Sequence, residues 1–137
     1  MIFPNLHSLE KAETMLVNTP CMRFTEDNFR IEVLESQVLV LVDCWASWCC
    51  TLQEFNVIFN DLAISFDGQI KVGRLNIATS QQLASHYGIR VVPTLLFFQD
   101  GQMVERVVGS LSQQQLANKV SALLTVKPLH RSQIACL

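Results

Sequence analysis

Cys49 lies in the segment WASWCCTLQEF (residues 45–55), in a position suited to a nucleophilic thiol. The apolar run VLVLV at 38–42, typical of a buried strand, comes before it, and a helical pattern follows. A cysteine at the start of that helix would lie near free backbone N–H groups and the positive end of the helix dipole. Such surroundings lower a thiol pKa from about 8.5 to about 7 or below. The sequence therefore predicts a nucleophile at Cys49, the alternative being an inert buried cysteine.

The residue three positions after Cys49 is Leu52, so the helix start has no second thiol at that spacing. Cys50 could act as a resolving thiol, but neighbouring Cα atoms lie ~3.8 Å apart and disulfides usually span about 4.4–6.8 Å. Cys136 lies in a C-terminal tail, and the stretch after Thr125 could extend roughly 36 Å and return over the domain. The alternative for Cys136 is an unpaired tail thiol.

The five cysteines form an odd and irregular set, unlike the disulfide framework of a small secreted protein. Cys44, within the apolar run, is expected in the core, and Cys21 has no predicted role. The N-terminal segment lacks the features of a signal peptide, and no apolar run is long enough to span a bilayer. We therefore expect a cytoplasmic protein with free or catalytic thiols and no membrane partner. The formal net charge of −2 gives no reason to expect nucleic acid as a partner.

Strands and helices alternate along most of the chain. The sequence predicts a central mixed β-sheet flanked by helices, an α/β fold in one domain. We expect an N-terminal helical extension at 1–21, with its helix at 8–18, a domain at 22–125 and a tail at 126–137. The expected strands are 22–24, 37–45, 68–77 and a hairpin over 94–109 that turns at Asp100-Gly101, and the expected helices are 25–36, 49–66, 79–89 and 112–124.

Two segments of the chain resemble thioredoxins. VLVDCWASWC at 40–49 resembles the strand that leads into the active site of that family, with Asp43, Trp45 and Trp48 in matching positions. The segment at 87–109 resembles the second half of the family's fold, including Val-Pro-Thr at 92–94. The resemblance covers roughly residues 22–125 and implies the thioredoxin fold.

The resemblance also implies roles for several residues. Cys49 corresponds to the nucleophile of the family's Cys-x-x-Cys motif, whose second cysteine is replaced by Leu52. Asp43 matches a buried carboxylate that assists proton transfer, and Arg74 matches a position that often carries lysine. Because arginine keeps its proton, we expect Arg74 to hold Asp43 ionised. A purely structural ion pair is the alternative.

A substrate-binding surface is implied around Cys49. Val92-Pro93 resembles the family's cis-proline loop, whose backbone binds the substrate chain as an added strand. Trp48, Val92 and Gly109 would surround the nucleophile with apolar surface. No spacing of cysteine and histidine residues indicates a metal site, and no cofactor is expected.

These features predict an atypical thiol–disulfide oxidoreductase with a single nucleophilic cysteine. It would form mixed disulfides with client proteins that carry disulfides or reactive thiols, or with glutathione disulfides. The alternative is a redox-sensing binding module or holdase-like chaperone with little turnover. An iron–sulfur cluster shared across a dimer is a third hypothesis, but the residues around Cys49 do not resemble such sites. The sequence does not decide whether glutathione or a thioredoxin reductase is the electron donor. It also leaves open whether the chain forms a homodimer.

Overall fold

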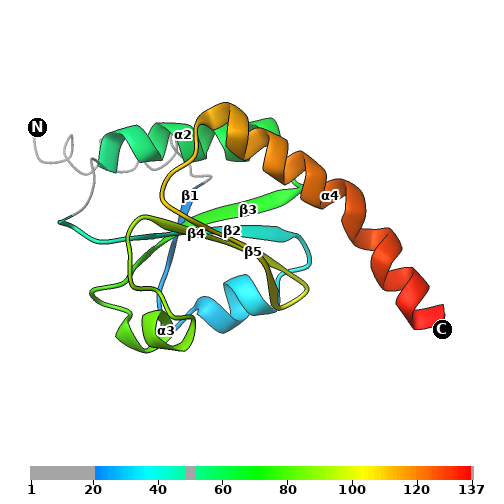
Figure 1. Cartoon of the computed structure of the whole chain (residues 1–137), viewed down its shortest axis with the longest axis horizontal. Coiled ribbons are helices and arrows are strands. Elements are labelled where there is room, and N and C mark those ends of the chain that lie inside the picture. Colours follow the sequence, from blue (N-terminus) through cyan, green and yellow to red (C-terminus); the bar gives the residue numbers. More distant parts are fainter. Residues whose placement is uncertain (1–20, 49–51, 137) are drawn as a thin grey trace, which may run out of the picture.

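A computed structural model of the chain describes residues 21–48 and 52–136, with the backbone alone described at 52–56 and 126–136. Strands and helices alternate as the sequence predicts (Figure 1). They are β1 (Cys21–Phe24), the short π-helix η1 (Arg30–Leu34), β2 (Leu39–Trp45), α2 (Leu52–Ser65), β3 (Ile70–Asn76), α3 (Gln81–His86), β4 (Thr94–Gln99), β5 (Gln102–Val108) and α4 (Gln113–Cys136).

The strands form one mixed sheet in the order β1-β3-β2-β4-β5. β1, β3 and β2 are parallel, whereas β4 runs antiparallel to β2 and β5 antiparallel to β4. Helices α2 and α4 cover one face of this sheet, and η1 and α3 lie on the other (Figure 1). The predicted α/β fold with a central mixed sheet is therefore confirmed.

The central strand β2 is buried on both faces, as its continuous apolar run predicts. Leu39 and Leu41 pack under α2 and α4, whereas Val40, Val42 and Cys44 pack under η1 and α3. Cys44 is fully buried, which confirms its predicted place in the core. The hairpin between β4 and β5 turns at Asp100 and Gly101, both with positive φ, as expected.

A glycine on β3 allows the first strand to pack closely. A Cβ atom added to Gly73 would lie 2.3 Å from Cε2 of Phe24, so the Phe24 ring occupies the space that a side chain would need. Phe24 is buried in the core with Phe29 and Phe98. The ring of Phe29 contacts those of Phe24 and Phe98 edge-on. Gly73 thereby fixes how the edge strand β1 joins the sheet.

The C-terminal residues differ from the expectation. Residues 126–136 were predicted as a tail, but they continue α4, which ends at Cys136. The segment after Thr125 contains leucine, arginine, glutamine and alanine, which favour a helix, and also Pro128, which disfavours one in a helix interior. The end of this helix leads away from the sheet (Figure 1).

The first strand begins close to its predicted start. β1 begins at Cys21, one residue earlier than expected. The helix predicted at 8–18 lies outside the described residues. Within the described part of the chain, no helix is both long and apolar enough to cross a membrane.

Candidate functional site

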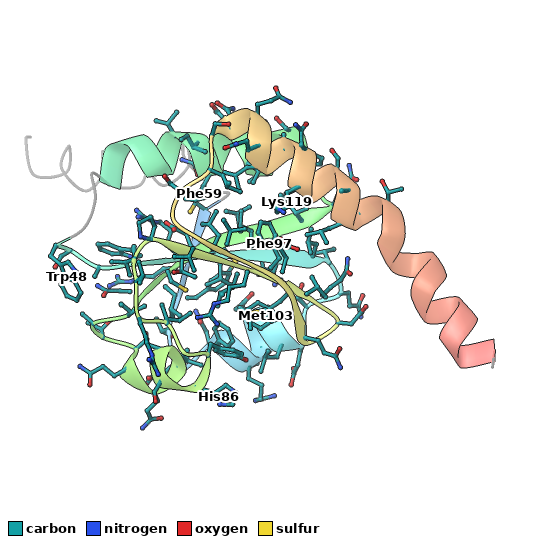
Figure 2. All side chains as sticks on the ribbon, viewed as in Figure 1. Trp48, Phe59, His86, Phe97, Met103 and Lys119 are labelled. Carbon is teal, nitrogen blue, oxygen red and sulfur yellow. The ribbon has the colours of Figure 1, made fainter. Side chains whose placement is uncertain are left out.

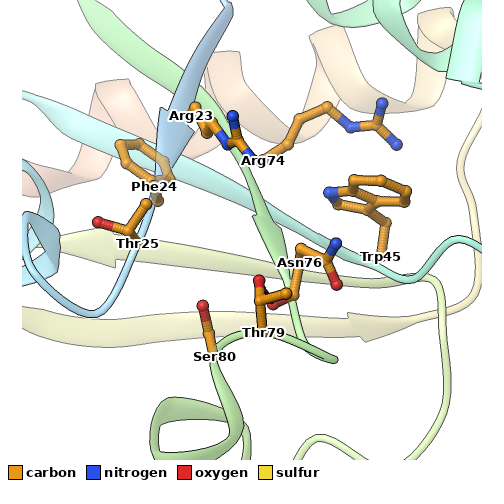
Figure 3. A pocket seen from close by; sticks show the side chains of 8 residues that line it. All are labelled: Arg23, Phe24, Thr25, Trp45, Arg74, Asn76, Thr79 and Ser80. Atoms are coloured by element: carbon orange, nitrogen blue, oxygen red, sulfur yellow. Dashed lines mark hydrogen bonds between the residues drawn. The ribbon is translucent and has the colours of Figure 1, made fainter.

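Asp43 and Arg74 form a buried ion pair within the sheet. They occupy neighbouring register positions on β2 and β3. Arg74 Nε donates a hydrogen bond of 3.0 Å to Asp43 Oδ2, and the two side chains are only 8% and 1% exposed. The Arg74 guanidinium also lies over the Trp45 ring, 4.8 Å from its centroid (Figure 3). The predicted association of Asp43 with Arg74 is therefore present, with Trp45 as its support.

Burial raises the pKa of Asp43 from 3.8 to about 6, while the charge and the hydrogen bond of Arg74 oppose the rise. Arg74 therefore limits the effect of burial but does not cancel it. With a pKa of about 6, Asp43 is mostly ionised at neutral pH, and the role of Arg74 in keeping it ionised stays a prediction. Among the described residues, Asp43 Oδ1 has no hydrogen-bond partner. A carboxylate that titrates near neutrality can accept and return a proton.

Neither cysteine whose side chain is described is a ready nucleophile. Burial raises the pKa of the Cys21 thiol to about 11. The charge of Arg74 lowers this pKa by a smaller amount, and the charge of Asp43 raises it slightly. Burial also raises the pKa of the Cys44 thiol, to about 12. Both therefore stay protonated at neutral pH, and neither is suited to resolve a mixed disulfide there.

The other three cysteines are described only in part or not at all. Cys49 and Cys50 lie outside the described residues, between Trp48 and the start of α2 at Leu52. Only the backbone of Cys136 is described, at the end of α4. A helix rises about 1.5 Å per residue, so as a helix the chain after Thr125 reaches less than half as far as an extended tail. The resolving roles of Cys50 and Cys136 stay predictions.

The predicted substrate-binding residues meet at one end of the sheet. Thr94, the first residue of β4, is the register partner of Cys44 near the end of β2 and of Val108 at the end of β5. The cis peptide bond Val92-Pro93 therefore lies at the same end of the sheet as Trp48 and Gly109. The Gly109 N–H donates a hydrogen bond of 2.8 Å to the Pro93 carbonyl, which joins two of these segments.

Apolar side chains are exposed at this end of the sheet. Trp48 is 69% exposed and Val108 61%, and Val91 is also exposed. Figure 2 shows Trp48 projecting from the domain. We call Trp48, Val91 and Val108, together with the Val92-Pro93 loop, the docking surface. Val91 and Val108 were not predicted, although both are direct neighbours in sequence of predicted residues.

No metal site is visible in the part of the chain that the structure describes. There, no three histidine, cysteine, aspartate or glutamate side chains lie close enough together to hold a metal ion.

The sheet order, the cis-proline directly before β4 and the buried aspartate on β2 together define a thioredoxin-type α/β protein. Residues 20–122 match the family model described as Thioredoxin. The chain is 43% identical over 94 residues to "Thioredoxin 1" of Synechococcus elongatus, covering 69% of this chain and 88% of that protein. It is 42% identical over 93 residues to "Thioredoxin 1" of a Nostoc species, covering 68% and 87%. It is 36% identical over 96 residues to "Thioredoxin" of Chlorobaculum thiosulfatiphilum, covering 70% and 89%. The chain belongs to the thioredoxin family of thiol–disulfide oxidoreductases.

Proposed function

We propose that this chain catalyses thiol–disulfide exchange with Cys49 as its single nucleophile. The observation that carries the proposal is the buried Asp43–Arg74 pair beside the docking surface. A buried carboxyl group whose pKa is raised by desolvation, with a specific charge partner beside it, is typical of catalytic sites and favours catalysis over a passive scaffold. Leu52 stands where a Cys-x-x-Cys motif would have its second thiol, so the resolving thiol has to come from elsewhere.

The reaction proceeds in two exchanges. The Cys49 thiolate attacks one sulfur of a client disulfide, which forms a mixed disulfide and releases the other client sulfur as a thiolate. A second thiolate then attacks the mixed disulfide at the Cys49 sulfur and releases the client as a dithiol. A third thiol frees Cys49 by forming a disulfide with the second. The electron pair that reduces the client thus comes from two external thiols such as glutathione, or from Cys136 and one further thiol.

Asp43 assists the second exchange. Its carboxylate takes the proton of the incoming thiol, directly or through water, and returns it to the departing client thiolate. Arg74 orients the carboxylate through Oδ2 and leaves Oδ1 for this transfer. Because an arginine does not give up its proton, it positions the group without competing for the proton.

The docking surface binds the client. An extended client segment pairs with the backbone beside Pro93, and its apolar side chains contact Trp48, Val91 and Val108. Client proteins bearing disulfides or reactive thiols are therefore the proposed partners. Glutathione and a thioredoxin reductase are the two proposed electron donors. The cytoplasmic location and the formation of a homodimer stay predictions.

Reduction of insulin disulfides tests this proposal. The rate is measured with dithiothreitol, with glutathione, and with thioredoxin reductase and NADPH, for the wild type and for Cys49→Ser, Cys50→Ser and Cys136→Ser. We expect Cys49→Ser to fall to background with every donor. Full activity in Cys49→Ser would show that another group is the nucleophile. Unchanged turnover in Cys136→Ser would assign resolution to the external thiol.

A second function is favoured by the exposure of the docking surface together with Leu52. Under this alternative the chain is a redox-sensing binding module or holdase that holds clients with little turnover. The wild type would then reduce insulin no faster than the donor alone. It would still suppress the aggregation of an unfolded client, and a charged residue at Val108 would abolish that suppression.

A further inference from the structure

A pocket of about 320 Å³ opens beside the Asp43–Arg74 pair, at the carboxyl ends of the three parallel strands (Figure 3). This end of an open α/β sheet is where ligands commonly bind, and the volume suits a small molecule or one end of a larger one. The proposed exchange reaction makes no use of this pocket. Its side chains include Arg23 from β1, Arg74 from β3, Trp45 from β2, and Asn76, Thr79 and Ser80 from the end of β3 and the loop after it.

Two arginines stand side by side in this pocket. Arg23 and Arg74 are register partners on β1 and β3, and neighbouring strands lie about 4.8 Å apart, so their side chains leave the same face of the sheet close together. Like charges side by side are unfavourable unless an anion lies between or beside them. Asp43 pairs with Arg74, whereas Arg23, an exposed residue, makes no ion pair with any described residue.

The remaining polar side chains of the pocket can donate hydrogen bonds, and none of the lining residues that the structure describes is acidic. The Ser80 side chain is buried, at 2% exposed, yet its hydroxyl makes no capping bond to α3. The carboxylate of Glu26 instead accepts hydrogen bonds from the backbone N–H groups of Gln82 and Leu83. The Ser80 hydroxyl points toward the pocket in Figure 3. The hydroxyl group of the buried Ser80 and the guanidinium group of Arg23 thus line the same cavity.

We propose that this pocket binds a small oxyanion, a carboxylate or phosphate group, held by Arg23 and Ser80 with Arg74 as the second positive charge. The planar guanidinium fork matches the oxygens of either group. The Trp45 face is already covered by Arg74, so the ligand is recognised by charge and hydrogen bonds and not by stacking. This inference is independent of Cys49, and binding should persist in Cys49→Ser.

Calorimetric titration of the full chain tests the pocket at constant ionic strength, with sodium chloride as the reference anion. The probes are inorganic phosphate, succinate and S-methylglutathione, which carries carboxylates but no free thiol. We expect saturable one-to-one binding of at least one probe and a shift of the Trp45 indole N–H resonance. Binding of phosphate alone would assign a phosphate group, and binding of the other two a carboxylate.

Variants decide whether the pocket is the site. Arg23→Gln should weaken binding about tenfold or more, because it removes a charge-assisted hydrogen bond, and Arg23→Lys should weaken it less. Ser80→Ala should weaken binding severalfold. Arg90→Gln removes the same charge from an exposed residue outside the pocket and should have no effect. Absence of saturable binding, or equal losses in Arg23→Gln and Arg90→Gln, would overturn the proposal.

Discussion

Arg74 Nε donates a hydrogen bond to Asp43 Oδ2 across 3.0 Å between two parallel strands, and both side chains are buried. The pair places a titratable carboxyl group on β2, the strand that precedes Cys49 in the sequence. Removing two charges from water is costly, and a single hydrogen-bonded arginine offsets this cost only in part. The pKa of Asp43 accordingly lies at about 6 and not at its ordinary 3.8. The first two predictions rest on this relationship.

The charge of Asp43 should lower the stability of the fold at neutral pH. Because the folded-state pKa is raised, the contribution of Asp43 is fully present below about pH 4 and is lost as the pH rises through 6. A rise from 3.8 to about 6 corresponds to about 3 kcal/mol. Urea unfolding is measured for the wild type and Asp43→Asn from pH 4 to 7. Between these pH values, the unfolding free energy of the variant should rise relative to that of the wild type by about this amount. A difference in unfolding free energy that does not vary with pH would refute the assignment.

The same carboxyl group should govern the pH dependence of turnover. We expect the insulin-reduction rate of the wild type to rise through pH 6 as Asp43 becomes a base. Asp43→Asn should lack this step and be slower at pH 7 by about 100-fold. Asp67→Asn, an exposed aspartate, serves as the matched control and should behave as the wild type does. An unchanged pH profile in Asp43→Asn would leave Asp43 as a structural partner of Arg74 only.

The docking surface should determine the affinity for clients and not the chemistry. Val108→Asp places a charge among exposed apolar groups and should raise KM for insulin about tenfold with little change in kcat. Val104→Asp makes the same change on the same strand, four residues from the docking surface, and should have no effect. Equal effects of the two substitutions on KM would show that the client does not bind at the end of the sheet.

Gly73 should be required for the packing of the first strand. In Gly73→Ala the new Cβ atom would lie 2.3 Å from the Phe24 ring, so the ring or strand β1 has to move. We expect a loss of about 1–3 kcal/mol in unfolding free energy. Phe24→Leu removes the crowded ring atoms, so the two substitutions together should cost less than the sum of their separate effects. Strict additivity would show that the crowding is not the cause.

Glu26 should stabilise α3 across a long sequence separation. Its Oε2 accepts hydrogen bonds of 2.7 and 3.3 Å from the backbone N–H groups of Gln82 and Leu83. Glu26→Ala should lower the unfolding free energy by about 1 kcal/mol and speed hydrogen exchange at those two amides. Asp27→Ala removes a neighbouring exposed charge and should change neither quantity. Unaltered exchange in Glu26→Ala would mean that the cap does not hold α3 in solution.

Several features of the fold could be predicted because their causes are local. The run of apolar residues makes β2 a strand buried on both faces, and Asp100-Gly101 can adopt the positive φ values of a tight hairpin turn. The cis Val92-Pro93 bond and the approach of Arg74 to Asp43 were expected from resemblance to thioredoxins. They could not have been derived from spacing alone, because 31 residues separate the two charged groups.

The rest depended on which strands became neighbours. The register of β1 on β3 places Arg23 beside Arg74 and so makes the pocket at the carboxyl ends of the parallel strands basic, and no local pattern in either strand indicates this. The cap that Glu26 supplies to α3 was missed for the same reason, because 56 residues separate Glu26 from Gln82. Periodicity reports which face of an element is apolar, but the partner of a polar side chain is set by the register between distant segments. The sequence thus determined the elements and the identity of the reactive groups, and the tertiary structure decided which of those groups meet.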